Sequence, residues 1–156
     1  MSGLIAARPE TVQRPRLQRL LRYWHDRRLN RAMPSRSDID PLDMPWILGN
    51  LSLVEVHRQA DMPRYRYRLI GSRTAQRLRH DMTGKWLDEM QETQYRDRLF
   101  ACYAAMMELR QPLVERLDMM IDDRIHKYEI LRLPLSSDGN TIDMMMLAVD
   151  FVDPRV

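Results

Sequence analysis

The side chains that most often carry catalysis or bind metals are few and scattered in this chain of 156 residues. Its one cysteine, Cys102, lies between apolar neighbours in a helical segment, as expected of a buried core thiol rather than a nucleophile. The four histidines fall in four different segments and include no pair at i, i+4 spacing. No nucleophile motif, phosphate-binding loop or cysteine-rich zinc pattern is present. We therefore expect no catalytic residue, no metal site and no enzymatic activity.

Methionines and tyrosines could instead form a pocket for a small molecule. The chain has 13 methionines, whose flexible side chains fill irregular space and adapt to different shapes. Buried tyrosines need hydrogen-bond partners, which a ligand or water can supply. The alternative is a fully packed core without a cavity, and the sequence leaves both open. The candidate pocket residues are Tyr65, Tyr67, Leu69, Tyr103, Met106, Met119, Met144 and Met146.

Arginine dominates the positive charge of the chain. Lysine and arginine together number 25, yet 22 acidic residues reduce the formal net charge to +3. The acids are interleaved with the arginines, which argues against a nucleic-acid surface, because such a surface needs a face of net positive potential. The sharpest basic patch is the arginine stripe, Arg64, Arg66 and Arg68, on one face of a predicted strand. It could bind an anionic partner, or form a solvated face paired with acids such as Glu115 or Asp118.

The first 31 residues divide into a tail and a helix. Residues 1–13 show no apolar periodicity, so we expect a flexible tail. Residues 14–31 predict an amphipathic helix that begins near Pro15. Its apolar stripe must be covered, either by the chain's own domain or by a second copy in a homodimer. The candidate dimer-interface residues are Leu17, Leu20, Leu21 and Trp24.

The rest of the chain mixes strand and helix patterns. The strand-like segments are 51–57, 64–70, 113–121, 125–135 and 142–152. The helical segments between them are 72–79, 86–90 and 95–110. The last strand is apolar on both faces, which indicates a sheet covered on both sides. The short helices can cover one face and the first helix the other. The fold class expected is α+β.

This order of two strands, short helices, one longer helix and three strands resembles that of PAS domains. The sequence also resembles the stand-alone PAS family common in alphaproteobacteria, through the stretches PSRSDIDPLDMP (34–45), LVEV (53–56), YRLIG (67–71) and DMTG (81–84). The resemblance spans about residues 23–151. It implies a five-stranded antiparallel sheet with short helices and one longer helix over one face. We therefore expect a PAS domain at 32–153, preceded by the amphipathic helix.

The resemblance also bears on cofactors. Some PAS domains hold heme through a histidine on the long helix, and light-sensing members bind flavin through a cysteine motif. Residues 95–110 contain no histidine, and Cys102 lacks the polar neighbours of that motif. The resemblance therefore disfavours heme and flavin and names no other ligand, so an unknown small molecule stays open.

Together these patterns predict a non-enzymatic sensor or interaction module that binds a small molecule, or nothing, between the sheet and the long helix. Its signal is expected to pass to a partner protein or through homodimer geometry, since the chain has no room for a kinase, cyclase or DNA-binding effector. The alternative is a nucleic-acid-associated regulator that uses the arginine-rich helix and the arginine stripe. The chain shows neither a signal peptide nor an apolar run long enough for a membrane helix, so we expect a cytoplasmic protein without membrane contact.

Overall fold

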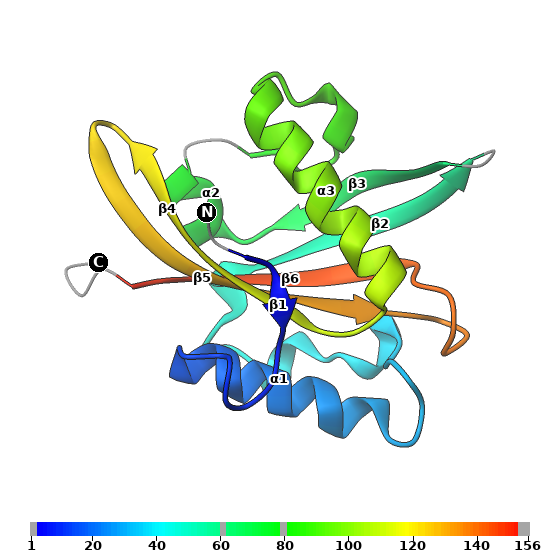
Figure 1. Ribbon diagram of the computed structural model, residues 1–156. Coiled ribbons are helices and arrows are strands. Elements are labelled where there is room, and N and C mark those ends of the chain that lie inside the picture. Colours follow the sequence, from blue (N-terminus) through cyan, green and yellow to red (C-terminus); the bar gives the residue numbers. More distant parts are fainter. Residues whose placement is uncertain (1–2, 60–61, 79–80, 153–156) are drawn as a thin grey trace.

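Antiparallel strands form one sheet in the computed structural model, which describes residues 3–59, 62–78 and 81–152 (Figure 1). Within these residues the sheet has six strands in the order β1-β4-β5-β6-β2-β3, so the β2–β3 hairpin lies beside the last strand. The strands are β1 (Ile5–Ala6), β2 (Leu51–Gln59), β3 (Met62–Ile70), β4 (Leu113–Ile121), β5 (Arg124–Leu135) and β6 (Met144–Phe151). The five strands predicted from the sequence are confirmed, and β1 is an addition to them.

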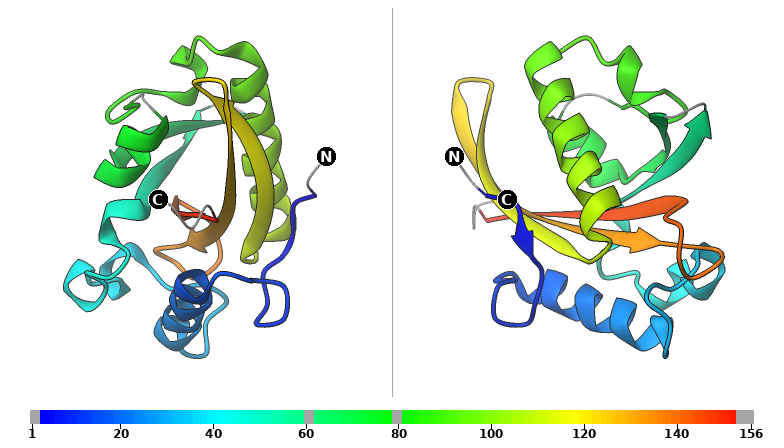
Figure 2. Two further views of the ribbon diagram at one scale, coloured as in Figure 1. Left: turned by 90° about the vertical axis from the view of Figure 1, so that its left-hand side faces the viewer. Right: turned by 45° about the vertical axis from the view of Figure 1, so that its right-hand side comes forward.

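Helices cover both faces of this sheet. The α-helices are α1 (Pro15–Arg28), α2 (Ser72–Leu78) and α3 (Thr93–Leu109). Short 3-10 turns are η1 (Arg36–Asp38), η2 (Pro41–Asp43), η3 (Leu48–Asn50) and η4 (Leu87–Glu89). In Figure 2, α3 crosses one side of the sheet and α1 lies beneath the other, against β5 and β6. We call the α3 side the inner face and the α1 side the outer face.

The start of α1 is tied to the outer face by a buried carboxylate. Pro15 occupies the first turn, where a missing N–H costs nothing. The backbone N–H groups of Gln13 and Arg14 donate to the Glu129 carboxylate of β5 at 2.7 to 3.1 Å. A negative group at a helix N-terminus also suits the helix dipole. Arg14, the N-cap residue of α1, makes no capping hydrogen bond with its own side chain, so Glu129 of β5 caps the helix instead.

The apolar stripe of α1 packs on the chain's own sheet. Trp24 Nε1 donates to the Pro134 carbonyl oxygen at 2.9 Å, which fixes the helix against β5. Because the chain itself covers the stripe, these side chains leave no surface for a second copy. Their assignment to a homodimer interface is therefore corrected to packing within the domain, and the expectation that the first helix covers the second face is confirmed. The four residues, all at most 2 % exposed, are Leu17, Leu20, Leu21 and Trp24.

The described part of the expected tail is also bound to the sheet. Ile5 and Ala6 pair with Val114 and Leu113 at the edge of β4. Thr11 Oγ1 donates to the Ala6 carbonyl oxygen at 2.7 Å. The expectation of a flexible tail is therefore corrected for residues 3–13, whereas residues 1 and 2 lie outside the described residues. A two-residue strand held by backbone hydrogen bonds needs no apolar periodicity, so the sequence pattern could not reveal it.

A close backbone approach connects β3 to α2. A Cβ atom on Gly71 would lie 2.4 Å from the carbonyl oxygen of Gly49 and 2.7 Å from that of Leu51. No side chain fits there, so glycine is required at this position. This contact sets α2 beside η3 and places its Thr74 at the inner face.

Candidate functional site

A buried arginine marks the inner face. Arg132 interrupts the apolar run of β5, and its side chain is 1 % exposed. Its Nη1 donates to Glu115 Oε1 at 2.9 Å. Arg98 of α3, which is one-third exposed, places Nη2 2.5 Å from the other oxygen of that carboxylate. One carboxylate is therefore shared by two guanidinium groups.

The strand register explains how Arg132 and Glu115 meet. In the β4–β5 pairing Glu115 lies opposite Ile130, which makes it the diagonal neighbour of Arg132 on the same face. The Nε of Arg132 has no hydrogen-bond partner among the residues that the structure describes. A buried donor without an acceptor costs about 1–3 kcal/mol and is uncommon. This N–H is therefore available to a bound acceptor.

Two tyrosines form a second polar group beside the arginine. The hydroxyls of Tyr67 from β3 and Tyr103 from α3 are 2.8 Å apart. Burial raises the pKa of both phenols well above the ordinary value, so both are neutral at physiological pH. When one phenol of such a pair donates to the other, the accepting phenol keeps its own proton. The pair can therefore donate one hydrogen bond to a third group.

These polar groups line a small, partly open cavity of about 60 Å³ between the inner face and α3. The Oγ1 of Thr74, which also lies at this cavity, has no partner among the described residues. The polar residues of the lining are Ser52, Tyr67, Thr74, Tyr95, Tyr103 and Arg132. Its apolar residues include Leu99, Ile130, Leu147 and Val149. The site thus combines buried donors with apolar walls.

A larger open groove of about 700 Å³ runs beside this cavity. It lies between the β4–β5 hairpin and the start of α3, and Arg98, Arg116 and Lys127 contribute to its lining. Tyr95 lines both the groove and the cavity. Tyr95 therefore lies where the cavity and the groove adjoin.

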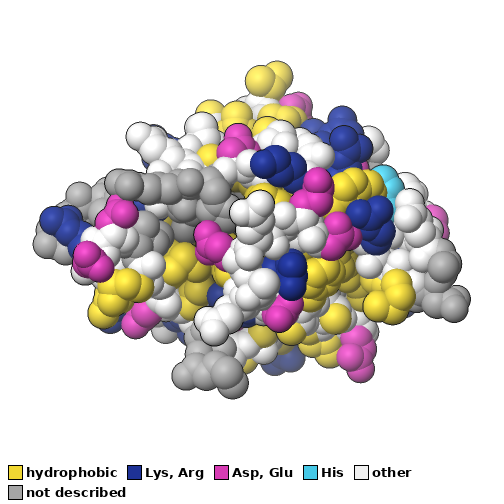
Figure 3. All heavy atoms as spheres, turned by 90° about the horizontal axis from the view of Figure 1, so that it is seen from above, with side chains coloured by type: hydrophobic (Ala, Val, Ile, Leu, Met, Phe, Trp, Pro, Cys, Tyr) yellow, Lys and Arg dark blue, Asp and Glu magenta, His cyan; other side chains and the backbone are white. Residues whose placement is uncertain are grey.

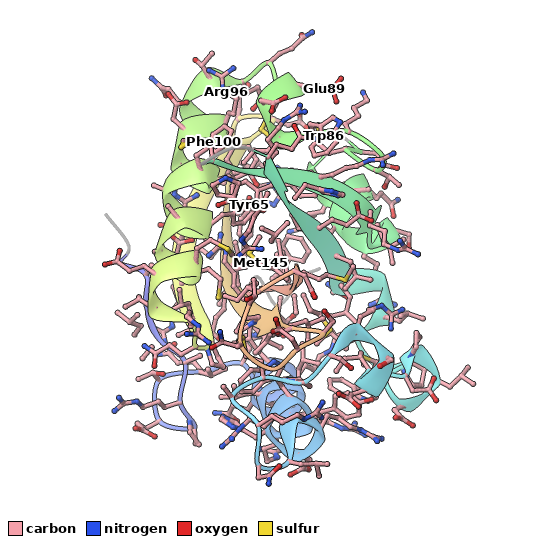
Figure 4. The ribbon with its side chains drawn as sticks, turned by 90° about the vertical axis from the view of Figure 1, so that its right-hand side faces the viewer. Tyr65, Trp86, Glu89, Arg96, Phe100 and Met145 are labelled. Atoms are coloured by element: carbon pink, nitrogen blue, oxygen red, sulfur yellow. The ribbon has the colours of Figure 1, made fainter. Side chains whose placement is uncertain are left out.

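The three tyrosines predicted for the pocket come together, whereas Met106 of α3 does not line the cavity. Tyr67 and Tyr103 line the cavity. Tyr65 packs edge-on against Tyr103, with ring centroids 5.1 Å apart. Figure 4 shows Tyr65 facing Phe100 of α3, with Met145 of β6 below. Met106 is fully buried on α3 and packs in the core rather than along the cavity.

Four other predicted pocket residues lie elsewhere. Met119 lines the open groove instead of the cavity. Met144 and Met146 pair with Glu55 and Leu53, on the outer face of β6. Their assignment is corrected, because the neighbouring positions of that strand, Leu147 and Val149, reach the cavity. The sequence pattern left both faces of β6 apolar and could not decide between them. Leu69, the fourth, is 43 % exposed.

A register shift in the β2–β3 hairpin accounts for Leu69. Leu53 pairs with Leu69 but Val54 pairs with Tyr67, so Arg68 is an extra residue in β3. Strand alternation fails across such a bulge. Leu69 therefore leaves the face of Tyr67, and its assignment to the pocket is corrected: Ile70 lines the cavity instead. The sequence could not reveal this shift, because apolar and charged residues alternate without interruption from Arg64 to Leu69.

The arginine stripe lies at the outer face and is paired within the chain. Arg64 makes two hydrogen bonds to the Asp88 carboxylate, at 2.9 and 3.1 Å, and its guanidinium lies 4.0 Å from the centre of the Trp86 ring. Arg68 reaches Glu55 at 3.3 Å. Arg66 donates to the Gly84 carbonyl oxygen at 3.3 Å. These partners are not Glu115 and Asp118, the acids that the sequence suggested. The three arginines are nevertheless held by groups of the chain itself, so they do not form an unpaired basic surface.

Reactive groups are scarce at the site. Burial raises the pKa of the Cys102 thiol, so the thiolate that a nucleophile requires is disfavoured. Among the described residues no three His, Cys, Asp or Glu side chains gather in a way that could hold a metal ion. None of the described helices is long and apolar enough to cross a membrane. The chemistry that the site offers is hydrogen bonding and charge.

Four residues of the site were not predicted as such from the sequence: Arg132, Glu115, Thr74 and Tyr95. One signal was present: a single arginine within the apolar run ILRLPL of β5. Charged residues are almost never fully buried unless paired, so this position could have been singled out. The partners of Arg132 depend on strand register and on where α2 and α3 lie, which the sequence pattern does not contain.

The comparisons with known proteins agree with this architecture. A PAS domain family model matches residues 12–148, which is most of the chain. No curated protein and no solved structure gives a significant match. The family match covers the sheet except β1 and the end of β6, together with the whole of α1 and of α3. With its antiparallel sheet, crossing helix and internal cavity, the chain belongs to the PAS domain family.

Proposed function

We propose that this chain is a non-enzymatic sensor module in which a small molecule binds between the inner face of the sheet and α3. The observation that carries the proposal is the small cavity lined by Arg132 and Thr74, because each of these residues has a buried polar atom, Arg132 Nε and Thr74 Oγ1, without a partner among the described residues. PAS domains are generally sensory or interaction modules, which agrees with this role. A ligand that accepts these hydrogen bonds removes an energetic penalty of the fold.

The outer face provides a route for the signal. Alternate residues of β5 face opposite sides, so Arg132 at the cavity is flanked by Leu131 and Leu133, which are fully buried on the outer side with α1. A ligand that shifts Arg132 also shifts the strand under α1. Such a shift transmits a signal only if the ligand binds two arrangements with different affinity. We propose that the output is a change in the contacts that the α1 side makes with another protein chain.

The identity of that second chain is a separate question. The sequence analysis expected a homodimer through the α1 stripe, but that stripe is covered. A homodimer would therefore use another surface, and we keep homodimerisation as part of the proposal without that interface. The nucleic-acid alternative gains no support, because the arginine stripe is paired internally and basic and acidic side chains intermix on the face seen in Figure 3.

Native mass spectrometry of the protein as purified from cells tests the proposal. We expect a mass that exceeds a whole number of chains, with the excess lost on denaturation. A parallel measurement follows the methyl resonances of Met82 and Met90, which line the cavity, as a small-molecule cell extract is added. An exact multiple of the chain mass together with unchanged resonances would contradict ligand binding. The same spectra report how many chains associate.

A further inference from the structure

The charge at the cavity is not balanced. Arg132 and Arg98 share the single carboxylate of Glu115, which leaves one positive charge in excess over these three groups. Arg98 is one-third exposed, so water screens part of its charge, whereas Arg132 is 1 % exposed and cannot be hydrated in this way. The nearby Cys102 thiol and the tyrosine pair are neutral and supply no anion, because burial raises their pKa values. A buried guanidinium that shares its counterion favours a bound anion.

The hydrogen-bonding groups at the cavity point to the same class of ligand. Arg132 Nε is a donor only, and the tyrosine pair has one proton to donate. The hydroxyl of Thr74 can donate as well. The carboxylate of Glu115 does not line the cavity, so it does not compete for these donors there. Donors converging on an apolar cavity match a ligand whose polar end consists of oxygen acceptors.

The size of the cavity favours a small ligand. A water molecule needs about 10–15 Å³ of such a cavity, so about 60 Å³ holds about four to six non-hydrogen atoms. Nucleotides, flavins, hemes and aromatic acids are far larger. Apolar side chains lie next to these donors and suit a short hydrocarbon end: Leu147 is the cross-strand neighbour of Arg132, and Leu99 lies one turn before Tyr103 on α3. Inorganic oxyanions lack such an end.

From these three observations we infer that the cavity binds a short-chain monocarboxylate of two or three carbons, with its carboxylate at Arg132 Nε and the Tyr67–Tyr103 pair. This inference rests on the proposed function and names the ligand class of the same site. The ligand enters from the open groove past Tyr95, which lines both spaces.

Calorimetric titration of the full chain with sodium acetate and sodium propionate tests the inference, at an ionic strength held constant with sodium chloride. We expect one site per chain for each acid. Acetamide, which has the size of acetate without its charge, should bind at least about tenfold more weakly, since charge-assisted hydrogen bonds are the stronger ones. Benzoate, which exceeds the cavity, should not bind. Equal binding of acetamide and acetate, or of benzoate and acetate, would overturn the inference.

Three variants locate the binding. Arg132→Met should weaken acetate binding at least about tenfold, and Thr74→Val about three- to tenfold. Arg68→Met, which removes an arginine from the outer face, is the matched control and should leave binding unchanged. If Arg132→Met does not fold, Thr74→Val decides, because it keeps the side-chain shape. Binding that survives every inner-face substitution would place the acid elsewhere.

The outcomes separate this inference from the proposed function. If neither acid binds but native mass spectrometry shows another retained compound, the ligand class is wrong and the sensor proposal stands. If neither acid binds, no compound is retained and the cell extract leaves the Met82 and Met90 resonances unchanged, both are wrong. Binding of acetate that depends on Arg132 supports both.

Discussion

The two faces of strands β4, β5 and β6 bury charge in different ways. On the outer face, Glu129 of β5 accepts hydrogen bonds from two backbone N–H groups and from Arg116 Nε at 2.9 Å. Asp150 of β6 contacts the guanidinium groups of Arg14 and Arg16, whose side chains are about one-third exposed. On the inner face, the fully buried Arg132 shares one carboxylate and keeps an Nε without a partner among the described residues.

The difference separates a structural role from a binding role. The outer carboxylates are satisfied by the chain itself, and they fasten α1 and the segment before it to the sheet. The inner arginine is held in place, but its Nε has no partner among the described residues, which agrees with a ligand as the remaining partner under the proposed function. Comparable burial thus anchors α1 on the outer face and is proposed to serve ligand recognition on the inner face.

The largest expected effect comes from removing the outer pair. Arg116→Met combined with Glu129→Leu leaves the backbone N–H groups of Gln13 and Arg14 without their acceptor. We expect a loss of about 2–3 kcal/mol in the free energy of unfolding, measured by urea denaturation, since two part-buried donors lose their partner. Asp97→Asn, at a side chain that is 72 % exposed, should change stability little. A stable double variant would show that the outer charges do not anchor α1.

A smaller effect is expected from alkaline pH at the tyrosine pair. The phenols of the unfolded chain ionise near pH 10, but burial raises the pKa of Tyr67 and Tyr103 in the folded chain. Above that pH the unfolded chain holds fewer protons, so stability is complete below about pH 10 and falls as the pH rises. Each such group lowers the free energy of unfolding by about 1.4 kcal/mol per pH unit.

Urea denaturation of the wild type and of Tyr67→Phe across about pH 8 to 11 measures this effect. The variant should lose stability less steeply above about pH 10, by the contribution of one phenol. Tyrosinate absorbance of the folded protein gives an independent reading of the same groups. Equal slopes for the two proteins would mean that the Tyr67 phenol is not held neutral on the inner face.

The smallest effect on stability is expected from removing the inner pair. Arg132→Met combined with Glu115→Leu exchanges a buried ion pair for apolar side chains of similar volume, a change that is often neutral or stabilising. Arg98, already one-third exposed, can turn to water. We expect the free energy of unfolding to change by less than about 1 kcal/mol, which urea denaturation measures beside the outer double variant. A loss as large as on the outer face would make the inner pair an anchor as well.

Much of the fold could be predicted from the sequence, because it depends on local patterns. The periodicity of residues 14–31 and the two apolar faces of the last strand are enough to place a helix on each side of a sheet. The site was harder to predict, because it depends on which face of the sheet each strand residue points to. One extra residue at Arg68 moves Leu69 out of the cavity, and the two apolar faces of β6 hid the fact that Leu147 and Val149 face inward. Tyr67 and Tyr103 were found because a buried hydroxyl needs a partner wherever it lies.

The shared wall formed by Tyr95 has a kinetic consequence. Under the proposed function, an occupant that exchanges through the groove must pass this side chain. Residence time and equilibrium affinity would then depend on different side chains, with Arg132 holding the occupant and Tyr95 controlling how fast it leaves. A sensor built in this way would average the concentration of its ligand over the residence time and ignore faster fluctuations.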